Sequence, residues 1–446
     1  MAAIIEPRTL KGFRDFLPPQ EIERRSLIEK IERSFRSFGF VPIDTPALEY
    51  AGILLGKGGG ETDKQIYRFK DNGDRDVALR FDLTVPFARF VAQYKQELVL
   101  PFKRYHIAKV WRGENTQRGR YREFTQCDID IVGSDSAAAD FEILLVIRNT
   151  FRTLGLDAGI RLNHRGLFNR FLTNIKADGR SVEILRIVDK LTKVGEDETR
   201  KALEEITGEG AGKIVEYINR RGAYGETLEA LTALAGGACP ESERLATLHS
   251  YMKDTGTEDS FTLDPSITRG LDYYTGIVYE TFLNEDPSIG SVCSGGRYDN
   301  LAGLYARERI SGVGTSIGLD RLIAALESLG KLEKRSGYTV LAITWGGERE
   351  AGRRQALAER FRAEGIPCET LLESADEAPA AGKALTRQFI QAEKKGIPWV
   401  LIPPEEGSGE FVLRDTRERR SLEALSFQEV IRTIAPRGPS RAACPA

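Results

Sequence analysis

Four runs of strand type constrain the fold of this chain more than any other feature of its sequence. They alternate apolar and polar residues or are rich in β-branched and aromatic residues, as strands in a half-buried sheet are. The runs are VALRFDLTV (77–85), RYHIAKVWR (104–112), EFTQCDIDIVG (123–133) and GIVYETFL (276–283). Before them, apolar residues at helical spacing predict a helix from about Pro19 to Phe38. The pattern indicates an antiparallel sheet with helices packed against it.

Three blocks of different pattern divide the chain. The strand-rich block covers residues 1–165 and resumes over 261–332. Between its two parts, residues 166–260 carry apolar residues at helical spacing and are punctuated by glycines, which predicts a helical insertion. Strand and helix patterns then alternate over 337–436, as in a small α/β domain. The last residues, 437–446, are predicted to form a disordered tail.

The composition is that of a globular protein, and it excludes several classes of protein. Sixty-four Lys and Arg face 66 Asp and Glu, and this near-neutral balance argues against an indiscriminate nucleic-acid coat. No apolar run is long enough to cross a membrane, and the start has no apolar core of signal-peptide length. Five scattered cysteines and three histidines form neither a disulfide framework nor a zinc pattern. These features predict a cytoplasmic protein without a zinc site.

Polar side chains are predicted to share one face of each of two strands, because side chains alternate along a strand. They are Arg80, Asp82 and Thr84 in the first run, and Arg122, Phe124, Gln126, Asp128 and Asp130 around the third. Either strand alone is equally consistent with the solvent-facing side of a half-buried sheet. Two such faces in one sheet, flanked by glycines and arginines, favour a binding site.

Arginines near glycines or aromatic residues are candidates for holding phosphate, because the guanidinium fork binds phosphate oxygens bidentately. The candidates are Arg112, Arg120, Arg122, Arg269, Arg297 and Arg321. Any one of them could instead form a surface salt bridge, and only convergence in one cleft would make a phosphate clamp. No P-loop is present. The glycines of 312–318 indicate either a phosphate loop or tight packing where a strand meets a helix.

Several segments resemble the histidyl-tRNA synthetase family of class II aminoacyl-tRNA synthetases. WRGENTQRGRYREFTQCDID (111–130) resembles motif 2 of the class, and TRGLDYYTGIVYE (268–280) resembles the histidine-site signature of the family. Other similar segments are FGFVPIDTPALE (38–49, motif 1), GVGTSIGLDRL (312–322, motif 3), SGGRYDNLAG (294–303), GFRDFLPPQ (12–20) and LRFDLTVPFARFVA (79–92). The resemblance covers nearly the whole chain, and RGLDYY together with GGRYD is its most specific part.

The resemblance implies an α+β fold and a two-step reaction. The fold is a class II catalytic domain, an antiparallel sheet flanked by helices, with a helical insertion and a C-terminal α/β anticodon-binding domain. The implied enzyme is a homodimer with motif 1 at its interface. It activates L-histidine with ATP, releasing pyrophosphate, and then esterifies the 3′ end of histidine tRNA, releasing AMP. Mg²⁺ on the β- and γ-phosphates is also implied, without an assigned protein ligand.

The family pattern assigns the catalytic and ATP-binding roles residue by residue. Arg112 and Arg269 are the implied catalytic residues, on two sides of the α-phosphate, and both contact the histidine substrate. Positive charge is needed there because a carboxylate must attack an anionic phosphate. The implied ATP-binding residues are Arg112, Glu114 at the adenine amino group, Arg120, Phe124 stacked on the ring, and Arg321 at the γ-phosphate.

The implied amino-acid pocket pairs each polar group of histidine with a protein group. The residues around the α-ammonium group are Asp82, Thr84 and Gln126, and those around the imidazole are Asp130, Tyr273 and Tyr274. Such a site rejects apolar side chains because its own groups would then stay unsatisfied. It needs no catalytic histidine or cysteine.

Two positions and one loop depart from the family pattern, and two competing functions stay open. Asp82 and Asp130 stand where many bacterial members carry Glu, and the loop reads GENTQ where many read ERPQ. The loop change puts recognition of the extra 5′ guanosine of histidine tRNAs in doubt. One alternative is an inactive paralogue that binds histidine and regulates its biosynthesis, although such paralogues typically lack the C-terminal domain. The other is a class II synthetase for glycine, threonine or proline, although those families lack RGLDYY.

Overall fold

A computed structural model describes most of the chain. The described residues are 5–56, 65–268, 274–299, 303, 305, 309–332, 337–372, 384–404 and 409–434. They form two compact units, one of Met1–Asp15 with Ser26–Leu332 and a smaller one of Phe16–Arg25 with Glu333–Ala446. None of the helices in the described ranges is long and apolar enough to cross a membrane. The predicted tail, 437–446, lies outside the described residues.

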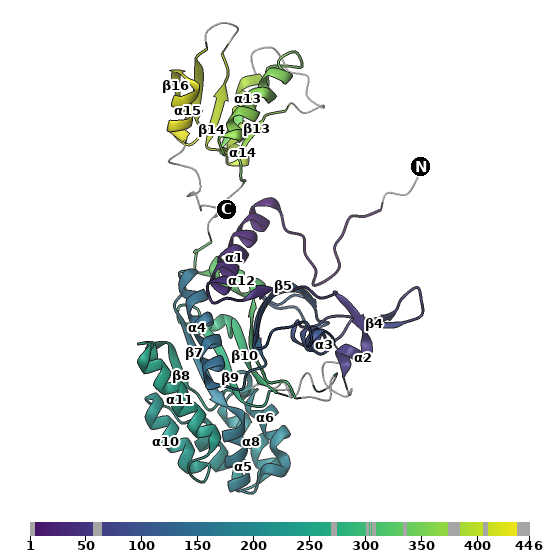
Figure 1. Ribbon diagram of the computed structural model, residues 1–446, viewed down its shortest axis with the longest axis vertical. Coiled ribbons are helices and arrows are strands. Elements are labelled where there is room, and N and C mark those ends of the chain that lie inside the picture. The colour runs from purple at the N-terminus through teal and green to yellow at the C-terminus, as the bar shows by residue number, and fades with distance from the viewer. Residues whose placement is uncertain are drawn as a thin grey trace. The chain divides into compact units, whose positions relative to one another are not determined.

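The larger unit is built on an eight-stranded sheet with the order β1-β5-β6-β11-β10-β9-β7-β8 (Figure 1). The strands are β1 Val41–Pro42, β5 Phe102–Trp111, β6 Glu123–Val132, β7 Ala158–His164, β8 Phe261–Leu263, β9 Ile277–Leu283, β10 Cys293–Tyr298 and β11 Gly312–Gly318. The central pairs, from β5 to β7, are antiparallel, which confirms the predicted sheet. Each edge adds a short parallel strand, β1 against β5 and β8 against β7.

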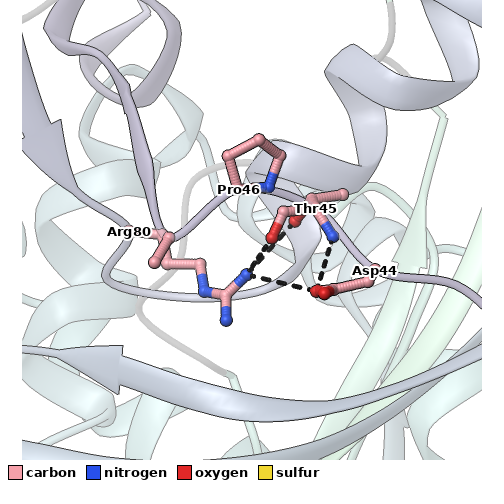
Figure 2. A pocket seen from close by; sticks show the side chains of 5 residues that line it. Asp44, Thr45, Pro46 and Arg80 are labelled. Carbon is pink, nitrogen blue, oxygen red and sulfur yellow. Dashed lines mark hydrogen bonds and ion pairs between the residues drawn. The ribbon is translucent and has the colours of Figure 1, made fainter.

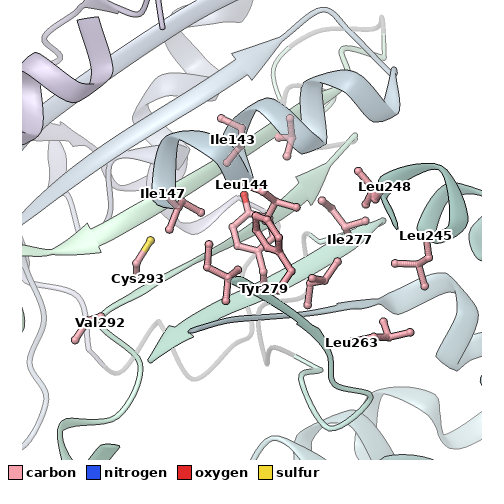
Figure 3. Packing of buried hydrophobic residues seen from close by; sticks show 14 of the residues in the cluster. Ile143, Leu144, Ile147, Leu245, Leu248, Leu263, Ile277, Tyr279, Val292 and Cys293 are labelled. Carbon is pink, nitrogen blue, oxygen red and sulfur yellow. The ribbon is translucent and has the colours of Figure 1, made fainter. Parts of the chain in front are cut away.

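Helices cover one face of this sheet and form the main core with it. The predicted first helix is present as α1 (Pro18–Ser37), and its Ile31 and Phe35 are fully buried. Helix α4 (Ala137–Thr153) packs Ile143, Leu144 and Ile147 near Tyr279 of β9 (Figure 3). The odd positions of β6, Cys127, Ile129 and Ile131, belong to the same cluster. The even positions of β6 therefore point to the opposite face.

A chain of helices connects β7 to β8 at one edge of the sheet. They are α5 Arg165–Asn174, α6 Ser181–Val188, α7 Leu191–Val194, α8 Glu196–Thr207, α9 Gly210–Ile218, α10 Tyr224–Leu234 and α11 Pro240–Asp254, with short 3₁₀ turns at Asp178–Arg180 and Glu258–Ser260. Because β7 and β8 are parallel neighbours, the chain must cross over between them. The helices lie where the sequence predicts an insertion, and their buried residues share the core of the sheet.

The first of the four predicted strands, residues 77–85, is wrong beyond Leu79. Strand β4 (Asp76–Leu79) lies in a three-stranded sheet with β2 (Leu48–Tyr50) and β3 (Arg68–Lys70). The chain then turns, and helix α3 (Thr84–Tyr94) begins. Asp82 Oδ1 accepts a hydrogen bond of 3.0 Å from the backbone N–H of Val85, in the first turn of α3. Such capping satisfies a free donor of the helix end, so it favours the helix over a continued strand.

The remaining elements of the larger unit are short helices beside the two sheets. They are α2 Ala51–Leu55, α12 Leu319–Ser328 and a 3₁₀ turn at Pro287–Ile289. Helix α12 follows β11 directly, so its first turn lies at the end of a central strand. The apolar residues of α12, namely Leu319, Leu322, Ala325 and Leu326, belong to the main core.

The smaller unit confirms the predicted alternation of strands and helices. Its sheet has the order β13-β12-β14-β15-β16, in which β12 runs parallel to both neighbours. The elements are β12 Leu341–Ile343, α13 Ala351–Ala363, β13 Cys368–Thr370, α14 Ala384–Lys395, β14 Trp399–Ile402, β15 Phe411–Asp415, β16 Arg420–Leu425 and α15 Phe427–Ile434. Strand β16 is not predicted by the sequence pattern, because this edge strand is mostly exposed and has no β-branched residue.

His164 predicts a specific pH dependence of folding. Its Nδ1 accepts a hydrogen bond of 3.1 Å from the N–H of Gly166 at the start of α5, and burial lowers its pKa to about 4. A histidine held neutral in this way stabilises the fold above pH 6.5, and that stability is lost as the pH falls toward 4. We expect the wild type to lose about 2 kcal/mol more than His164→Asn between pH 7 and pH 5, because Asn keeps the cap and cannot titrate.

Urea unfolding of both proteins at the two pH values measures this difference. His249→Asn is the matched control, because the His249 ring is nearer the surface and pairs with Glu258. Parallel losses in the wild type and His164→Asn would contradict the assignment.

Candidate active site

The face of the sheet opposite the core carries a row of polar side chains. Across β5 and β6, Arg104 lies opposite Asp130, and His106 lies opposite Asp128. Across β6 and β11, Ser316 lies opposite Asp128. The shared face predicted for β6 is therefore confirmed from Phe124 to Asp130. Asp128 and Asp130 are only 1% and 2% exposed, so this part of the face is not a solvent-facing surface.

Asp130 belongs to a fully buried polar network. An Arg104 guanidinium nitrogen lies 2.5 Å from Asp130 Oδ2, and the Tyr298 hydroxyl donates to Asp130 Oδ1. The Arg104 guanidinium also lies 4.2 Å from the centre of the Phe87 ring. Burial raises the pKa of Asp130 to about 6 against the opposing effect of Arg104. Neither Arg104 nor Tyr298 is among the predicted site residues. The alternation of side chains along a strand could have indicated Arg104, because the next residue, Tyr105, points into the core.

Two further carboxylates lie close to this network. Burial, helped by the charges of Asp130 and Asp82, raises the pKa of Asp128 to about 7 against the opposing effect of Arg104. Burial also raises the pKa of Asp82, while Arg112 and Arg104 oppose the shift. Three buried acids therefore gather around Arg104. The cluster can accept an additional positive group.

Glycines on β10 and β11 leave room for the side chains of Asp130, Tyr298 and Tyr274 to pack closely against the backbone of the sheet. A Cβ atom on Gly314 would lie 1.9 Å from Asp130 Oδ1, and one on Gly312 would lie 2.5 Å from the Tyr298 ring. A Cβ atom on Gly296 would lie 2.8 Å from the Tyr274 ring. Tight packing is thus the correct interpretation of Gly312 and Gly314. It does not apply to Gly318, where the nearest atom would be 3.9 Å away.

Arg112 stands between the acid cluster and the loop that joins β5 to β6. Its Nε–H donates to the Phe81 carbonyl over 2.8 Å, and its guanidinium lies 5.2 Å from the centre of the half-buried Phe124 ring. Glu114 lies 3.8 Å from Arg112 and 3.9 Å from Arg120, so its carboxylate is shared loosely by two arginines. The loop therefore brings two cations and one acceptor together beside an aromatic ring.

Arg321 joins this group from the first turn of α12. Burial, together with the nearby charges of Arg120 and Arg112, lowers its pKa to about 10. Glu280 of β9 and Glu114 act in the opposite direction. Three arginines thus lie close enough to repel one another, which is the convergence that the sequence could not establish. A polyanion such as a nucleotide phosphate would relieve that repulsion.

Two of the candidate arginines have structural contacts instead. Arg297 is buried and donates to Asp140 and to the Ser134 carbonyl, at 2.9 and 3.1 Å, so it ties β10 to α4. The prediction that it helps to clamp phosphate is wrong. Arg122 donates to the Glu114 carbonyl over 3.2 Å and holds the loop closed.

The other predicted residues are divided between described and undescribed parts of the chain. Thr84 is half-buried and begins α3 beside Asp82. Tyr274 is buried with Ile267 and Val278 in a small apolar cluster. Arg269 and Tyr273 lie outside the described residues, and the predictions for them stay predictions.

An arm at the N-terminus contacts the same region. The Arg14 guanidinium pairs with Asp320 of α12 and lies 3.8 Å from the centre of the Tyr121 ring. The other oxygen of Asp320 accepts from the N–H of Thr125 on β6 over 2.7 Å. The Gly12 carbonyl accepts from the N–H of Arg122 over 2.9 Å. The arm therefore links the loop, β6 and the start of α12.

Arg14 is expected to position the arginine group without touching ATP. Arg14→Gln should raise the KM for ATP about tenfold, the effect of losing about 1.4 kcal/mol, and leave histidine affinity unchanged. The measurement is ATP-dependent pyrophosphate exchange at varied ATP, with histidine affinity taken from calorimetry. Arg8→Gln is the matched control, since Arg8 on the same arm is exposed and lies near Glu6 alone. A wild-type KM for ATP in Arg14→Gln would contradict this role.

A separate hollow of about 420 Å³ lies at the segment that resembles motif 1. It is lined by Asp44, Thr45, Pro46, Ala47 and Arg80 (Figure 2). The Arg80 guanidinium donates to the carbonyl oxygens of Thr45 and Lys109, over 2.5 and 3.0 Å. Arg80 therefore supports the loop from within, and the hollow is distinct from the acid cluster.

Comparisons with known proteins agree with this geometry. A family model described as histidyl-tRNA synthetase matches residues 12–322. A protein of Treponema denticola called histidine–tRNA ligase is 54% identical over 410 residues, 90% of each chain. A ligase of the same name from Treponema pallidum is 45% identical and covers 98% of this chain and all of its own.

Solved structures give the same result. A histidyl-tRNA synthetase from a Nostoc species aligns with a TM-score of 0.83 at 31% identity, over 97% of this chain and all of its own. A Bacillus halodurans protein described as an ATP phosphoribosyltransferase regulatory subunit/histidyl-tRNA synthetase aligns with a TM-score of 0.73 at 21% identity, which shows a shared fold alone. From the family match and the extent of the similarity, the chain belongs to the histidyl-tRNA synthetase family.

Proposed function

We propose that the chain charges histidine tRNA by bringing ATP and L-histidine together between the three arginines and the acid cluster. The family membership makes the chain an ATP-dependent histidine–tRNA ligase. The observation that supports this site is the convergence of Arg112, Arg120 and Arg321 next to a buried row of acceptors. The presence of the C-terminal unit and of these arginines argues against the regulatory paralogue.

In the first step a carboxylate oxygen of histidine attacks the α-phosphorus of ATP. An O–P bond forms to give histidyl-adenylate, and the bond to pyrophosphate breaks. Arg112 takes the α-phosphate and the histidine carboxylate, with Arg269 on the other side, so positive charge is in place before two anions meet. In the second step the 3′-terminal hydroxyl of the tRNA attacks the carbonyl carbon, and AMP leaves.

The remaining nucleotide contacts follow from the loop and α12. Arg321 takes the γ-phosphate, and Arg120 lies beside the phosphate chain. Phe124 stacks on adenine, because its ring is half-exposed on the same face as Gln126. Glu114 accepts from the adenine amino group, since its carboxylate has only loose contacts with Arg112 and Arg120.

The acid cluster receives the amino acid. Gln126, Asp82 and Thr84 surround the α-ammonium group, and Gln126 Oε1 has no hydrogen-bond partner among the described residues. Asp130 and Tyr274 read the imidazole with Tyr273. Burial supports this assignment, because unsatisfied polar groups in a closed pocket select strongly against apolar side chains.

We also propose that ATP enters as its Mg²⁺ complex. Mg²⁺ commonly binds substrate phosphates with only one or two carboxylates. Within the described ranges no group of three or more His, Cys, Asp or Glu side chains could hold a metal ion. The Mg²⁺ would neutralise charge on the leaving pyrophosphate, with the β- and γ-phosphates as its main ligands.

The assembly and location of the enzyme complete the proposal. A homodimer through the motif 1 segment is supported by exposed apolar side chains on β1 to β3, namely Val41, Leu48, Tyr50 and Phe69. Residues 337–436 form the domain that reads the anticodon, and residues 166–260 act as the insertion domain. The cysteines of the described residues are buried and form no disulfide with one another, which fits a reducing compartment and the proposed cytoplasmic location.

Separate effects on the KM for ATP and the KM for histidine test the proposed division of the site into a nucleotide part and an amino-acid part. Arg321→Gln should raise the KM for ATP at least about tenfold and leave the KM for histidine unchanged, because it removes a charged contact to phosphate alone. Gln126→Ala should do the reverse. Arg200→Gln, an exposed change on α8, is the control. Equal changes of both constants in either variant would overturn the assignment.

A further inference from the structure

We propose that Asp128 is a further histidine-binding residue, whose carboxylate accepts the α-ammonium group of histidine together with the side-chain oxygen of Gln126. The inference rests on the proposed function and adds to its amino-acid pocket a residue that the family resemblance does not assign.

The first support is geometric. Asp128 lies on β6 between Gln126 and Asp130, on the same face, and is 1% exposed. The Ser316 hydroxyl accepts from Gln126 Nε2 over 2.6 Å and is hydrogen-bonded to Asp128. That link fixes the two side chains relative to each other. It leaves Asp128 Oδ1 and Gln126 Oε1 without a hydrogen-bond partner among the described residues.

The two buried acceptor oxygens, Asp128 Oδ1 and Gln126 Oε1, require a hydrogen-bond donor. Leaving a buried polar atom unsatisfied is unfavourable, and nearly all buried polar groups in native proteins have partners. An ammonium group has three N–H donors and a full positive charge, so one such group can satisfy both oxygens. A neutral imidazole has a single N–H and no charge. The α-ammonium end of histidine is therefore the better match.

The charges around Asp128 lead to the same ligand. Arg104 from β5 is ion-paired with Asp130, and its charge also lowers the pKa of Asp128, while Arg112 acts on Asp82. Arg80 also attracts Asp128 through its charge, but its N–H groups donate to backbone carbonyls.

His106, directly across β5, adds no positive charge. Its pKa is lowered to about 3 by burial and by Arg104 and Arg80, so it is neutral near pH 7. Its Nε2 lies 3.0 Å from Asp44 Oδ1. Among the described residues Asp128 is therefore attracted by the charges of Arg104 and Arg80 but has no direct ion pair.

Proton release on binding follows from this arrangement. Burial raises the pKa of Asp128 to about 7, so below that pH the free site holds a carboxylic acid. When the ammonium group binds, it favours the carboxylate, the O–H bond breaks, and the proton passes to the solvent. Above about pH 8.5 Asp128 is already ionised, and histidine binds without that release.

Asp128→Asn tests the proposal because it keeps the size of the side chain and removes its charge. We expect histidine affinity to fall about 10- to 100-fold, as for the loss of a charged hydrogen bond. The affinity for 3-(imidazol-4-yl)propionate, which lacks the ammonium group, should be the same in both proteins. Calorimetry in two buffers of different ionisation enthalpy counts the protons released on histidine binding. At pH 6.5 the wild type should release more protons than Asp128→Asn, by over half a proton per site, and at pH 8.5 the two proteins should not differ.

Two controls keep the result decisive. Asp157→Asn changes an exposed carboxylate of the same unit and should bind both ligands as the wild type does. Thermal unfolding without ligand at pH 8.5 should show Asp128→Asn to be at least as stable as the wild type, because a buried ionised carboxylate without a direct ion pair is removed. Equal histidine affinity in Asp128→Asn and wild type, or equal losses for histidine and the propionate, would overturn the proposal. If the wild type itself neither binds histidine nor supports exchange, the proposed function fails instead.

Discussion

Arg112→Gln should form histidyl-adenylate about 1000-fold more slowly than the wild type, the size of effect seen when a preorganised transition-state contact is lost. Arg112 is held by the Phe81 carbonyl and lies between the acid cluster and Glu114, where we propose that the histidine carboxylate and the α-phosphate meet. Its charge is most valuable when negative charge builds up on the phosphate. The rate constant of adenylate formation in a single turnover is therefore the quantity to measure.

Arg112→Lys is the matched control for this prediction. It keeps the positive charge but cannot form the two-pronged contact or donate to the Phe81 carbonyl in the same way. Its rate should lie between those of the wild type and Arg112→Gln. A rate for Arg112→Gln within tenfold of the wild type would refute the catalytic role of this residue. The corresponding prediction for Arg269→Ala is a comparable loss of rate with histidine binding largely kept.

Asp130→Ala should lower the free energy of unfolding by about 3–5 kcal/mol, in addition to its loss of histidine selectivity. The reason is the fully buried Arg104, whose ionic partner is Asp130. Without that carboxylate Arg104 loses its direct ion pair and keeps only the charge attraction of Asp82 and Asp128, beside the Phe87 ring. Denaturant unfolding of the free protein measures the loss, and exchange with different amino acids measures selectivity.

A double variant separates folding from recognition. Arg104→Met combined with Asp130→Ala removes both charges of the ion pair, so part of the lost stability should return, because no buried guanidinium is left without its partner. Histidine-dependent exchange should stay defective, because the imidazole contact is still missing. If Asp130→Ala alone were as stable as the wild type, the account of the Arg104 network would be wrong.

Three strands of the large sheet were predictable as runs of local pattern, and the failure of the fourth run has a local cause. The runs that became β5, β6 and β9 have the alternation that a half-buried strand needs. The run at 77–85 has the same alternation, yet Asp82 caps a helix there. The alternation of apolar and polar residues alone cannot reveal a capping hydrogen bond. Asp82 and the nearby Pro86 were the available signals, since proline is tolerated in the first turn of a helix.

The site was predictable in its residues more than in its contacts. Period-two alternation placed Gln126, Asp128 and Asp130 on one face, and the family resemblance supplied roles. The pairing of Arg104 with Asp130 depends on the register of β5 against β6. A slip of one residue would turn the side chains of one strand to the other face of the sheet and abolish the pair. The meeting of Arg112 with Arg321 joins residues that are distant in sequence, so no local pattern could establish it.

ATP–pyrophosphate exchange with each of the twenty amino acids, without tRNA, tests the central claim most directly. The account predicts exchange with histidine alone, because the buried acceptors around Gln126 and Asp130 must be satisfied by its ammonium and imidazole groups. Exchange with a different amino acid would contradict the pocket assignment. Histidine binding without any exchange would contradict the enzymatic role and favour a regulatory one.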